Sequence, residues 1–421
     1  SLPADNDVKR LARDNRQEVV FELLEEAGVA RKAARVRFGL PLPQGRLFQT
    51  AQLHLLAPDG SEAPAQFAVM GLWPDQSLKW VLVQFNTAIA ANERQLWRLE
   101  YGRDVRARAH RPTQLLLKNT PQNAVISNGL IQVVVNKERF GLAMSETGSP
   151  AGIKQLDVVL RDEAGKPFQA SGAACDDWRV EEQGPERIVV RMAGRYSDRQ
   201  GRGLMSYVAR LTCQRQSPLV ELSWTHINSE TDVEFTDISS LYLSATHATT
   251  MNTVAAAFQD SDGRPQKAMV ADLQTQSSAT IFQLDDRRAQ CSAPFPAVPG
   301  NDKSPQRLDS AVSTSGVHGG LGIAVQNLWQ RWPKAISAGS NELLIGLLPT
   351  QPSENYGQDL PYYLLYPFLK GKYRSKWGMA FTEKILIDVT GNLSRRELSA
   401  EADWPLLAVL PAEWYDSCRL F

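Results

Sequence analysis

The sequence predicts an all-β protein with two domains, a small N-terminal β-barrel followed by a large β-sandwich. Short apolar runs with period-two alternation recur along the chain, and turn residues separate them. Beyond residue 30, hardly any segment keeps the 3.6-residue apolar period of a helix. With 421 residues, the chain is long enough for two or three domains that each bury a core.

The first domain is predicted over residues 17–110, after a polar tail at 1–16. The run at 17–27 is ambiguous, because its apolar residues fit the stripe of a helix as well as a strand. Three shorter runs alternate or end in turn residues, at 35–38, 53–56 and 95–101. Short strands at this spacing are typical of a small barrel or sandwich.

A hairpin is predicted over residues 72–85. Trp73 and Pro74 close one extended run, and the polar turn Asp75-Gln76-Ser77 follows. Aspartate and serine favour chain reversal because their side chains bond to their own backbone. The run from Leu78 to Phe85 then forms a strongly apolar second strand.

Residues 103–112 are basic and predict a linker, either a solvated connector or a contact for an anionic glycan. The sandwich is predicted over 113–400. It begins with a strand pair at 124–135 that Asn128-Gly129 divides, a dipeptide suited to tight hairpin turns. Further strands are predicted at 188–192, 204–213, 219–224, 241–245, 321–325, 343–348 and 384–389. Two polar stretches near 259–280 and 295–315 are predicted to be loops.

The charge balance argues against nucleic acid or an anionic membrane as the partner, since Lys plus Arg and Asp plus Glu are both 46. No apolar run approaches the ~18 residues of a membrane-spanning helix. The first residues lack the basic and apolar pattern of a signal peptide, which is compatible with a mature N-terminus after signal removal.

No metal or cofactor is predicted. The four cysteines are far apart and exclude a clustered zinc site. Cys213 lies in a strand-like run and is predicted to be buried, while one disulfide stays possible. The acidic pairs Asp176-Asp177 and Asp285-Asp286 are interpreted as surface turns, so Ca²⁺ has no supporting motif. The glycine-rich segment 316–322 precedes a strand, which indicates a β-turn and not a phosphate loop.

Several segments resemble one family, the exo-acting rhamnogalacturonan lyase-like proteins of polysaccharide lyase family 26. The hairpin at 72–85 is similar to its "WPDGS-x-KW" segment, with Gln76 in place of Gly and Gln84 in place of Asp. In the segment 217–226 the pair Thr225-His226 reverses the His-Thr order that is usual in the family. In the segment 378–383 Phe381 stands where the family usually has Lys. The other similar segments are 38–45, 64–67, 217–226, 237–243, 327–335, 378–383 and 411–415.

The resemblance implies a RIFT-like barrel, with a strand at 17–27, and a secreted or periplasmic protein that cleaves uronate-containing glycans such as rhamnogalacturonan by β-elimination. Family members carry a helical toroid domain after this region, so residues 401–421 are expected to be a stub that leads to it. If that domain is absent, the alternative is a non-catalytic carbohydrate-binding or scaffold module. Oligomeric state has no signal in the sequence.

A uronate lyase must neutralise a carboxylate, remove the neighbouring C5 proton and protonate the leaving oxygen. The predicted catalytic residues are Tyr207, His226 and Tyr242. The predicted substrate-binding residues are Trp329, Arg331 and Lys334. For His226 the alternative is a core histidine, because the residues on its strand face are apolar. For Trp329 the alternative is a tryptophan that packs in the protein interior beside a surface arginine.

Overall fold

The computed structural model describes residues 16–106, 114–259, 268–275, 278–296, 305–350 and 371–420. The predicted tail, apart from residue 16, and most of the predicted linker lie outside these ranges. The chain divides into two compact units. The barrel unit comprises residues 1–114, 184–187 and 404–421, and the sandwich unit comprises 115–183 and 188–403. Both are built mainly of strands, which confirms the all-β prediction.

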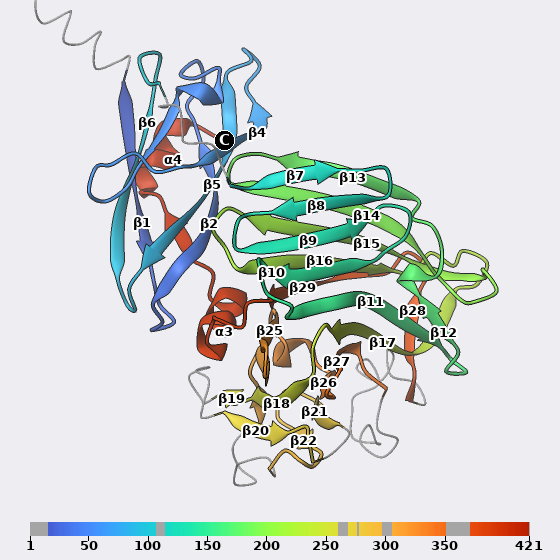
Figure 1. Cartoon of the computed structure of the whole chain (residues 1–421). Helices are drawn as coiled ribbons and strands as arrows, with labels where there is room; N and C mark the ends of the chain where they lie inside the picture. The colour runs from blue at the N-terminus through green and yellow to red at the C-terminus, as the bar shows by residue number, and fades with distance from the viewer. Residues whose placement is uncertain are drawn as a thin grey trace, which may run out of the picture. The chain divides into compact units, whose positions relative to one another are not determined.

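The barrel unit consists of two sheets around one core (Figure 1). One sheet has the order β3-β6-β1-β30, with β3 at Leu53–Leu56, β6 at Arg94–Tyr101, β1 at Gln17–Leu24 and β30 at Leu407–Val409. The other has the order β2-β5-β4, with β2 at Arg31–Pro41, β5 at Leu78–Ile89 and β4 at Gln66–Leu72. In β1 the residues Val19, Phe21 and Leu23 are buried in alternation. The ambiguous run is therefore a strand, as the resemblance implied.

The predicted hairpin at 72–85 is confirmed as β4, a turn and β5. Asp75 Oδ1 accepts hydrogen bonds from the Ser77 amide at 3.0 Å and the Ser77 hydroxyl at 2.6 Å. The amide of Trp73 donates to the Ser77 carbonyl at 2.8 Å. Gln76 has φ +67°, the left-handed region that favours glycine.

Replacing Gln76 by Gly is expected to stabilise the barrel unit by about 0.5–1 kcal/mol, because it removes the left-handed strain of a residue with a Cβ. The measurement is the shift in the midpoint of urea unfolding. The matched control is Gln49→Gly, since exposed Gln49 is extended at φ −140° and the same change should destabilise there. A loss of stability in Gln76→Gly equal to that control would contradict the argument from strain.

Residues 404–421 of the segment predicted at 401–421 belong to the barrel unit. β30 pairs antiparallel with Glu22–Leu24 of β1, and Leu406 and Leu410 join the barrel core. Helix α4, at Ala412–Cys418, follows. Its Trp414 donates from Nε1 to the Pro41 carbonyl at 3.0 Å.

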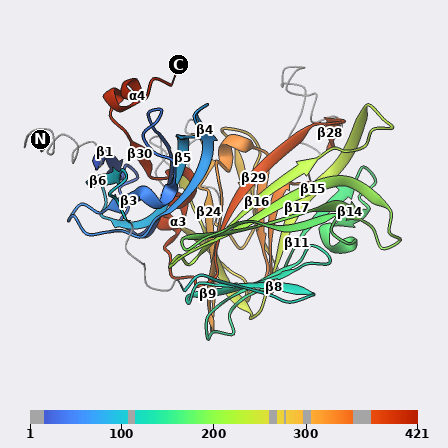
Figure 2. The same ribbon diagram turned by 90° about the horizontal axis from the view of Figure 1, so that it is seen from above.

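The sandwich unit contains two long runs of paired strands that form two layers (Figures 1 and 2). One ladder pairs β7 (Leu116–Asn119), β8 (Asn123–Ser127), β9 (Ile131–Asn136), β10 (Leu142–Glu146), β11 (Gly152–Asp162), β17 (Phe235–His247), β27 (Glu342–Leu348), β26 (Lys334–Ala338), β21 (Ala279–Gln283) and β22 (Ala289–Cys291). The other pairs β15 (Gly203–Gln214), β16 (Leu219–Ile227), β29 (Ala380–Asp388), β25 (Gly319–Val325), β24 (Ala311–Gly316), β18 (Met251–Ala256) and β20 (Met269–Asp272).

Shorter strands complete the unit. They are β12 (Pro167–Gln169) beside β11, β28 (Tyr373–Lys376) beside β17, the pair β13 (Asp177–Gln183) and β14 (Arg187–Ser197), and the pair β19 (Phe258–Gln259) and β23 (Arg307–Leu308). Short 3₁₀ turns lie at η1 (Thr50–Gln52) in the barrel unit, and at η2 (Ala170–Gly172) and η3 (Trp329–Arg331) in the sandwich unit.

One hydrophobic core joins the two layers of the sandwich unit, with Val133 of β9 and Trp224 of β16 among its members. The predicted turn at Asn128-Gly129 is confirmed: Asn128 Oδ1 accepts the amide hydrogens of Leu130 and Ile131, each at 3.0 Å. Cys213 is buried, also as predicted. All four cysteines are free.

One expectation for the sandwich is wrong, and one helix was not expected. The stretches predicted as loops near 259–280 and 295–315 contain β20 and β23, the start of β21 and most of β24. A helix, α3, occupies Arg395–Asp403. Its Leu398 and Ala402 pack in a small second core of the sandwich unit. Among the helices that the structure describes, none is long and apolar enough to cross a bilayer.

Candidate functional site

Two of the three predicted catalytic residues lie in the core of the sandwich unit. Tyr207 of β15 and His226 of β16 are direct cross-strand partners. Their exposed fractions are 1% and 3%. The Tyr207 ring stacks on Trp224 with 4.8 Å between centroids, and His226 Nδ1 lies 3.2 Å from the Tyr196 hydroxyl.

Burial also shifts the pKa values of both side chains further from 7, so neither is suited to proton transfer near neutral pH. It lowers the pKa of His226 to about 3, so the imidazole is neutral at pH 7. It raises the pKa of Tyr207, whose hydroxyl donates to the Ala170 carbonyl at 3.3 Å. His226 is thus placed as a core histidine, the alternative that its apolar strand neighbours suggested.

The third predicted catalytic residue, Tyr242, lies on β17 in the other ladder. It pairs with Val159 of β11 and with Gly346 of β27. Its ring is half-buried, and its hydroxyl accepts the Thr350 amide hydrogen at 3.0 Å. Tyr207 and His226 are neighbours, whereas Tyr242 lies on the other ladder.

The three predicted substrate-binding residues are close together, since η3 ends at Arg331 and β26 begins at Lys334. The Lys334 ammonium donates to the carbonyls of Arg331 at 2.8 Å and Leu347 at 2.9 Å. Arg331 donates from Nη1 to the Thr382 carbonyl at 2.6 Å. Its side chain is 37% exposed, so part of the guanidinium faces solvent.

Glu383 of β29 is the acidic partner of this cluster, and sequence reasoning did not assign it a role. Its Oε1 lies 3.3 Å from Lys334 Nζ and 3.4 Å from Arg331 Nη2. Both Lys334 and Glu383 are buried, at 2% and 1% exposed. Burial lowers the pKa of Lys334, and the charge of Glu383 acts in the opposite direction. Within the described ranges, Glu383 Oε2 has no hydrogen-bond partner.

Trp329 is held at both its edge and its face. Its Nε1 donates to Gln259 Oε1 at 2.8 Å, and the Arg307 guanidinium lies 4.1 Å from its ring centroid. The ring is half-buried. The Arg307 guanidinium and the Trp329 ring together offer an aromatic surface with a positive charge, and Trp329 stands two residues before Arg331 in the chain. Such a combination suits sugar contacts.

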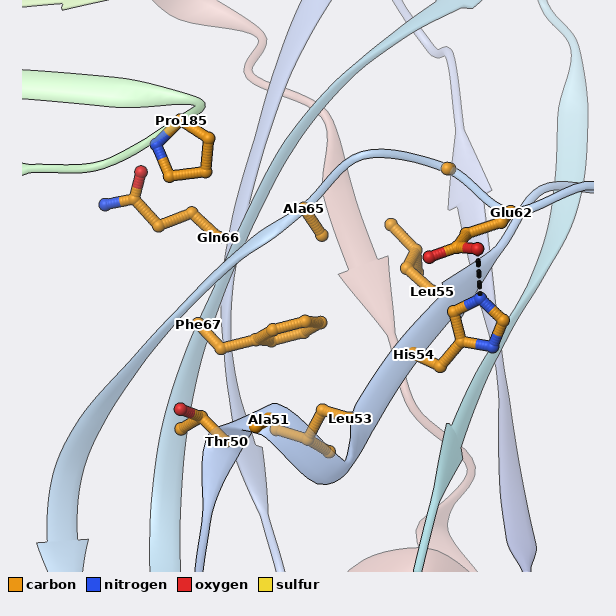
Figure 3. A pocket seen from close by; sticks show the side chains of 11 residues that line it. Thr50, Ala51, Leu53, His54, Leu55, Glu62, Ala65, Gln66, Phe67 and Pro185 are labelled. Carbon is orange, nitrogen blue, oxygen red and sulfur yellow. Dashed lines mark ion pairs between the residues drawn. The ribbon is translucent and has the colours of Figure 1, made fainter. Parts of the chain in front are cut away.

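A cavity of about 280 Å³ lies in the barrel unit (Figure 3). Phe67, Ala65 and Leu55 give it an apolar lining, and Glu62 and His54 stand at one side. His54 Nε2 is 3.1 Å from Glu62 Oε2, and its Nδ1 is 3.2 Å from a carboxylate oxygen of Glu100 outside the lining.

A largely apolar hollow with a few polar groups is the usual form of a small-ligand site. None of its lining residues was predicted as functional, because a histidine inside a short strand has no motif to mark it. Within the parts of the chain that the structure describes, no group of three or more His, Cys, Asp or Glu side chains is arranged to hold a metal ion.

Comparison with known protein families identifies the first unit. Residues 18–99 match the PcRGLX-like N-terminal RIFT barrel domain. These residues hold all the strands of the barrel unit except β30 and the ends of β1 and β6. The match supports an N-terminal domain similar to that of exo-rhamnogalacturonan lyase-like proteins. No curated protein matches the chain.

Two solved structures share the fold. One is an α-mannosidase from Enterococcus faecalis V583, 13% identical, with a TM-score of 0.53 over 97% of this chain and 48% of its own. The other is a protein in glycosyl hydrolase family 38 from Enterococcus faecalis, also 13% identical, with a TM-score of 0.57 over 97% of this chain and 50% of its own. The chain therefore spans about half the length of these two proteins.

Proposed function

We propose that this chain binds uronate-containing glycans such as rhamnogalacturonan, as the non-catalytic part of a polysaccharide lyase-like protein. The observation that carries the proposal is the match of residues 18–99 to a barrel domain of rhamnogalacturonan lyase-like proteins. The likeness of the whole chain to part of an α-mannosidase fold agrees with a role on carbohydrate. Burial of Tyr207 and His226 supports binding over catalysis for the described residues.

The Arg331 cluster is the proposed glycan contact in the sandwich unit. Arg331 keeps part of its guanidinium in solvent, and Trp329 with Arg307 supplies an aromatic surface beside it. Lys334 and Glu383 are buried and hold the backbone of this region in place, so their role is positioning. The proposal also implies a secreted or periplasmic protein, because pectin-type glycans lie outside the cell.

The second candidate function is β-elimination by the parent protein. In that reaction a base removes the C5 proton, a cation or hydrogen-bond donor stabilises the carboxylate, and an acid protonates the leaving oxygen. The family of the barrel unit favours this candidate. Among the predicted catalytic residues, half-buried Tyr242 is the group that substrate can approach with least rearrangement.

One pair of measurements distinguishes the two candidates. Calorimetric titration of this chain with rhamnogalacturonan oligosaccharides is expected to show saturable binding, weaker for the same oligosaccharides after carboxyl reduction. The ultraviolet absorbance of an unsaturated uronate product is expected to stay constant over the same incubation. A rise in absorbance would contradict the proposal of binding alone and would show that this chain catalyses the elimination. Absence of binding to either oligosaccharide set would overturn the proposal.

A further inference from the structure

We infer that a pocket at one end of the sandwich unit is a subsite for one uronate residue of a glycan. The inference rests on the proposed function and concerns residues apart from the Arg331 cluster. The pocket has a volume of about 360 Å³ and lies where β12, β15 and β17 begin. That volume is at the lower end for small-ligand sites, which suits a single sugar ring.

The walls of the pocket are aromatic and aliphatic. Phe168 of β12, Leu204 of β15 and Phe235 of β17 line it. Phe168 is 2% exposed and forms the buried floor beneath Arg202, so the accessible apolar surface comes from half-buried Leu204 and Phe235. Pyranose rings carry C–H groups on their faces, and such faces pack on aromatic side chains without a polar atom being left unpaired.

Arg202 supplies the positive charge. Its guanidinium carbon lies 5.3 Å from the Phe168 ring centroid, and its Nε is 3.4 Å from Asp198 Oδ2. Asp198 is already paired with Lys166 at 2.5 Å. Among the described residues, the two terminal nitrogens of Arg202 make no hydrogen bond or ion pair, and the side chain is 61% exposed.

The carboxylates of the pocket each have a partner. Asp237 is held by Arg374 through two hydrogen bonds of 2.8 Å. Glu163 lies 3.4 Å from Lys372, and Asp162 Oδ1 accepts the amide hydrogens of residues 164 and 166. The carboxylates of the pocket are therefore engaged by cations or backbone amides, whereas the terminal nitrogens of Arg202 are not engaged within the described ranges.

A planar guanidinium with two adjacent free nitrogens is matched by a carboxylate, which takes two parallel hydrogen bonds. Leu204 and Phe235 accept the sugar ring, and Thr236 and Asp237 offer polar atoms for its hydroxyl groups. A neutral sugar would leave the Arg202 donors unused. A polyanion such as nucleic acid would meet the carboxylates of Asp162, Glu163 and Asp237.

The test compares Arg202→Gln with Arg199→Gln in the full chain. Arg199 is an exposed arginine three residues earlier that does not line the pocket, so the charge change is matched. The probe is a rhamnogalacturonan tetrasaccharide with its carboxyl groups intact or reduced. Arg202→Gln is expected to weaken binding of the intact probe about ten-fold or more and to leave the reduced probe unchanged. Arg199→Gln is expected to change neither.

Arg202→Lys provides a second measure, because it keeps the charge and removes the planar fork. It is expected to fall between the wild type and Arg202→Gln. If the wild type binds the intact probe and Arg202→Gln binds it equally well, this subsite is wrong while glycan binding stands. If the wild type binds neither probe, the proposed function itself fails, and the subsite fails with it.

Discussion

Replacing Lys334 by Met is expected to destabilise the sandwich unit by about 3–5 kcal/mol, because it leaves the Glu383 carboxylate buried without its closest cation. The two carbonyls that now accept from Lys334, those of Arg331 and Leu347, would also lose their donor. Arg331 remains 3.4 Å from Glu383, but it is part-exposed and weaker as a partner.

The measurement is urea unfolding, together with hydrogen exchange of the β29 amides to assign the transition to this unit. A double variant, Lys334→Met with Glu383→Leu, is expected to recover most of the loss, because a buried ion pair can be replaced by apolar residues at little cost. Lys372→Met, at a lysine whose partner Glu163 is exposed, should change stability by less than about 1 kcal/mol. A double variant as unstable as the single one would show that the charge of Glu383 is not the cause.

Acidification from pH 7 to 4.5 is expected to remove about 2.5 kcal/mol of stability through His226 alone. Its folded pKa is about 3, below the ordinary value of 6.5, so between these values the unfolded chain binds a proton that the folded chain does not. Stability from this group is therefore fully present above pH 6.5 and decreases as the pH falls toward 3. His247, with a pKa lowered to about 4 by burial, acts in the same direction.

In His226→Phe the fall in unfolding free energy between pH 7 and 4.5 should be smaller by the amount assigned to His226. This holds whatever the substitution does to the unfolding free energy at pH 7. Comparing the slopes of two proteins is needed because Asp403 acts oppositely: burial raises its pKa to about 6. An unchanged slope in His226→Phe would mean that the imidazole gains a proton without unfolding the core.

Much of the fold follows from local signals, and the exceptions have physical causes. Asn128-Gly129 and the turn at Asp75-Gln76-Ser77 act within a few residues, so sequence shows them directly. The strand β11 was missed because its burial does not alternate: it pairs on both sides and has a register shift between Ile153 and Gln155. Helix α3 was missed because it is short, with Leu398 as its one large buried apolar residue.

The candidate site was harder to predict because burial depends on the opposite layer of the sandwich. Tyr207 and His226 alternate correctly on their strands, but sequence does not show that Trp224 and Tyr196 enclose them. The grouping of Trp329, Arg331 and Lys334 was predictable, since they lie within six residues of one another. Glu383 was not, because it joins them from a strand about fifty residues later, where it stands between Thr382 and Lys384 without a motif to mark it.

The pairing of β30 with β1 has a consequence for the order of events during synthesis. Residues 22–24 leave the ribosome early, while their partners at 407–409 emerge more than three hundred residues later. At about 5–20 residues per second, that delay is on the order of 20–80 s. During this interval one edge of β1 carries unpaired amides and carbonyls, and the positions of Leu406 and Leu410 in the barrel core are empty. The barrel unit thus begins before the sandwich unit and is completed after it, so a nascent chain needs protection of that edge until the whole sandwich unit has been made.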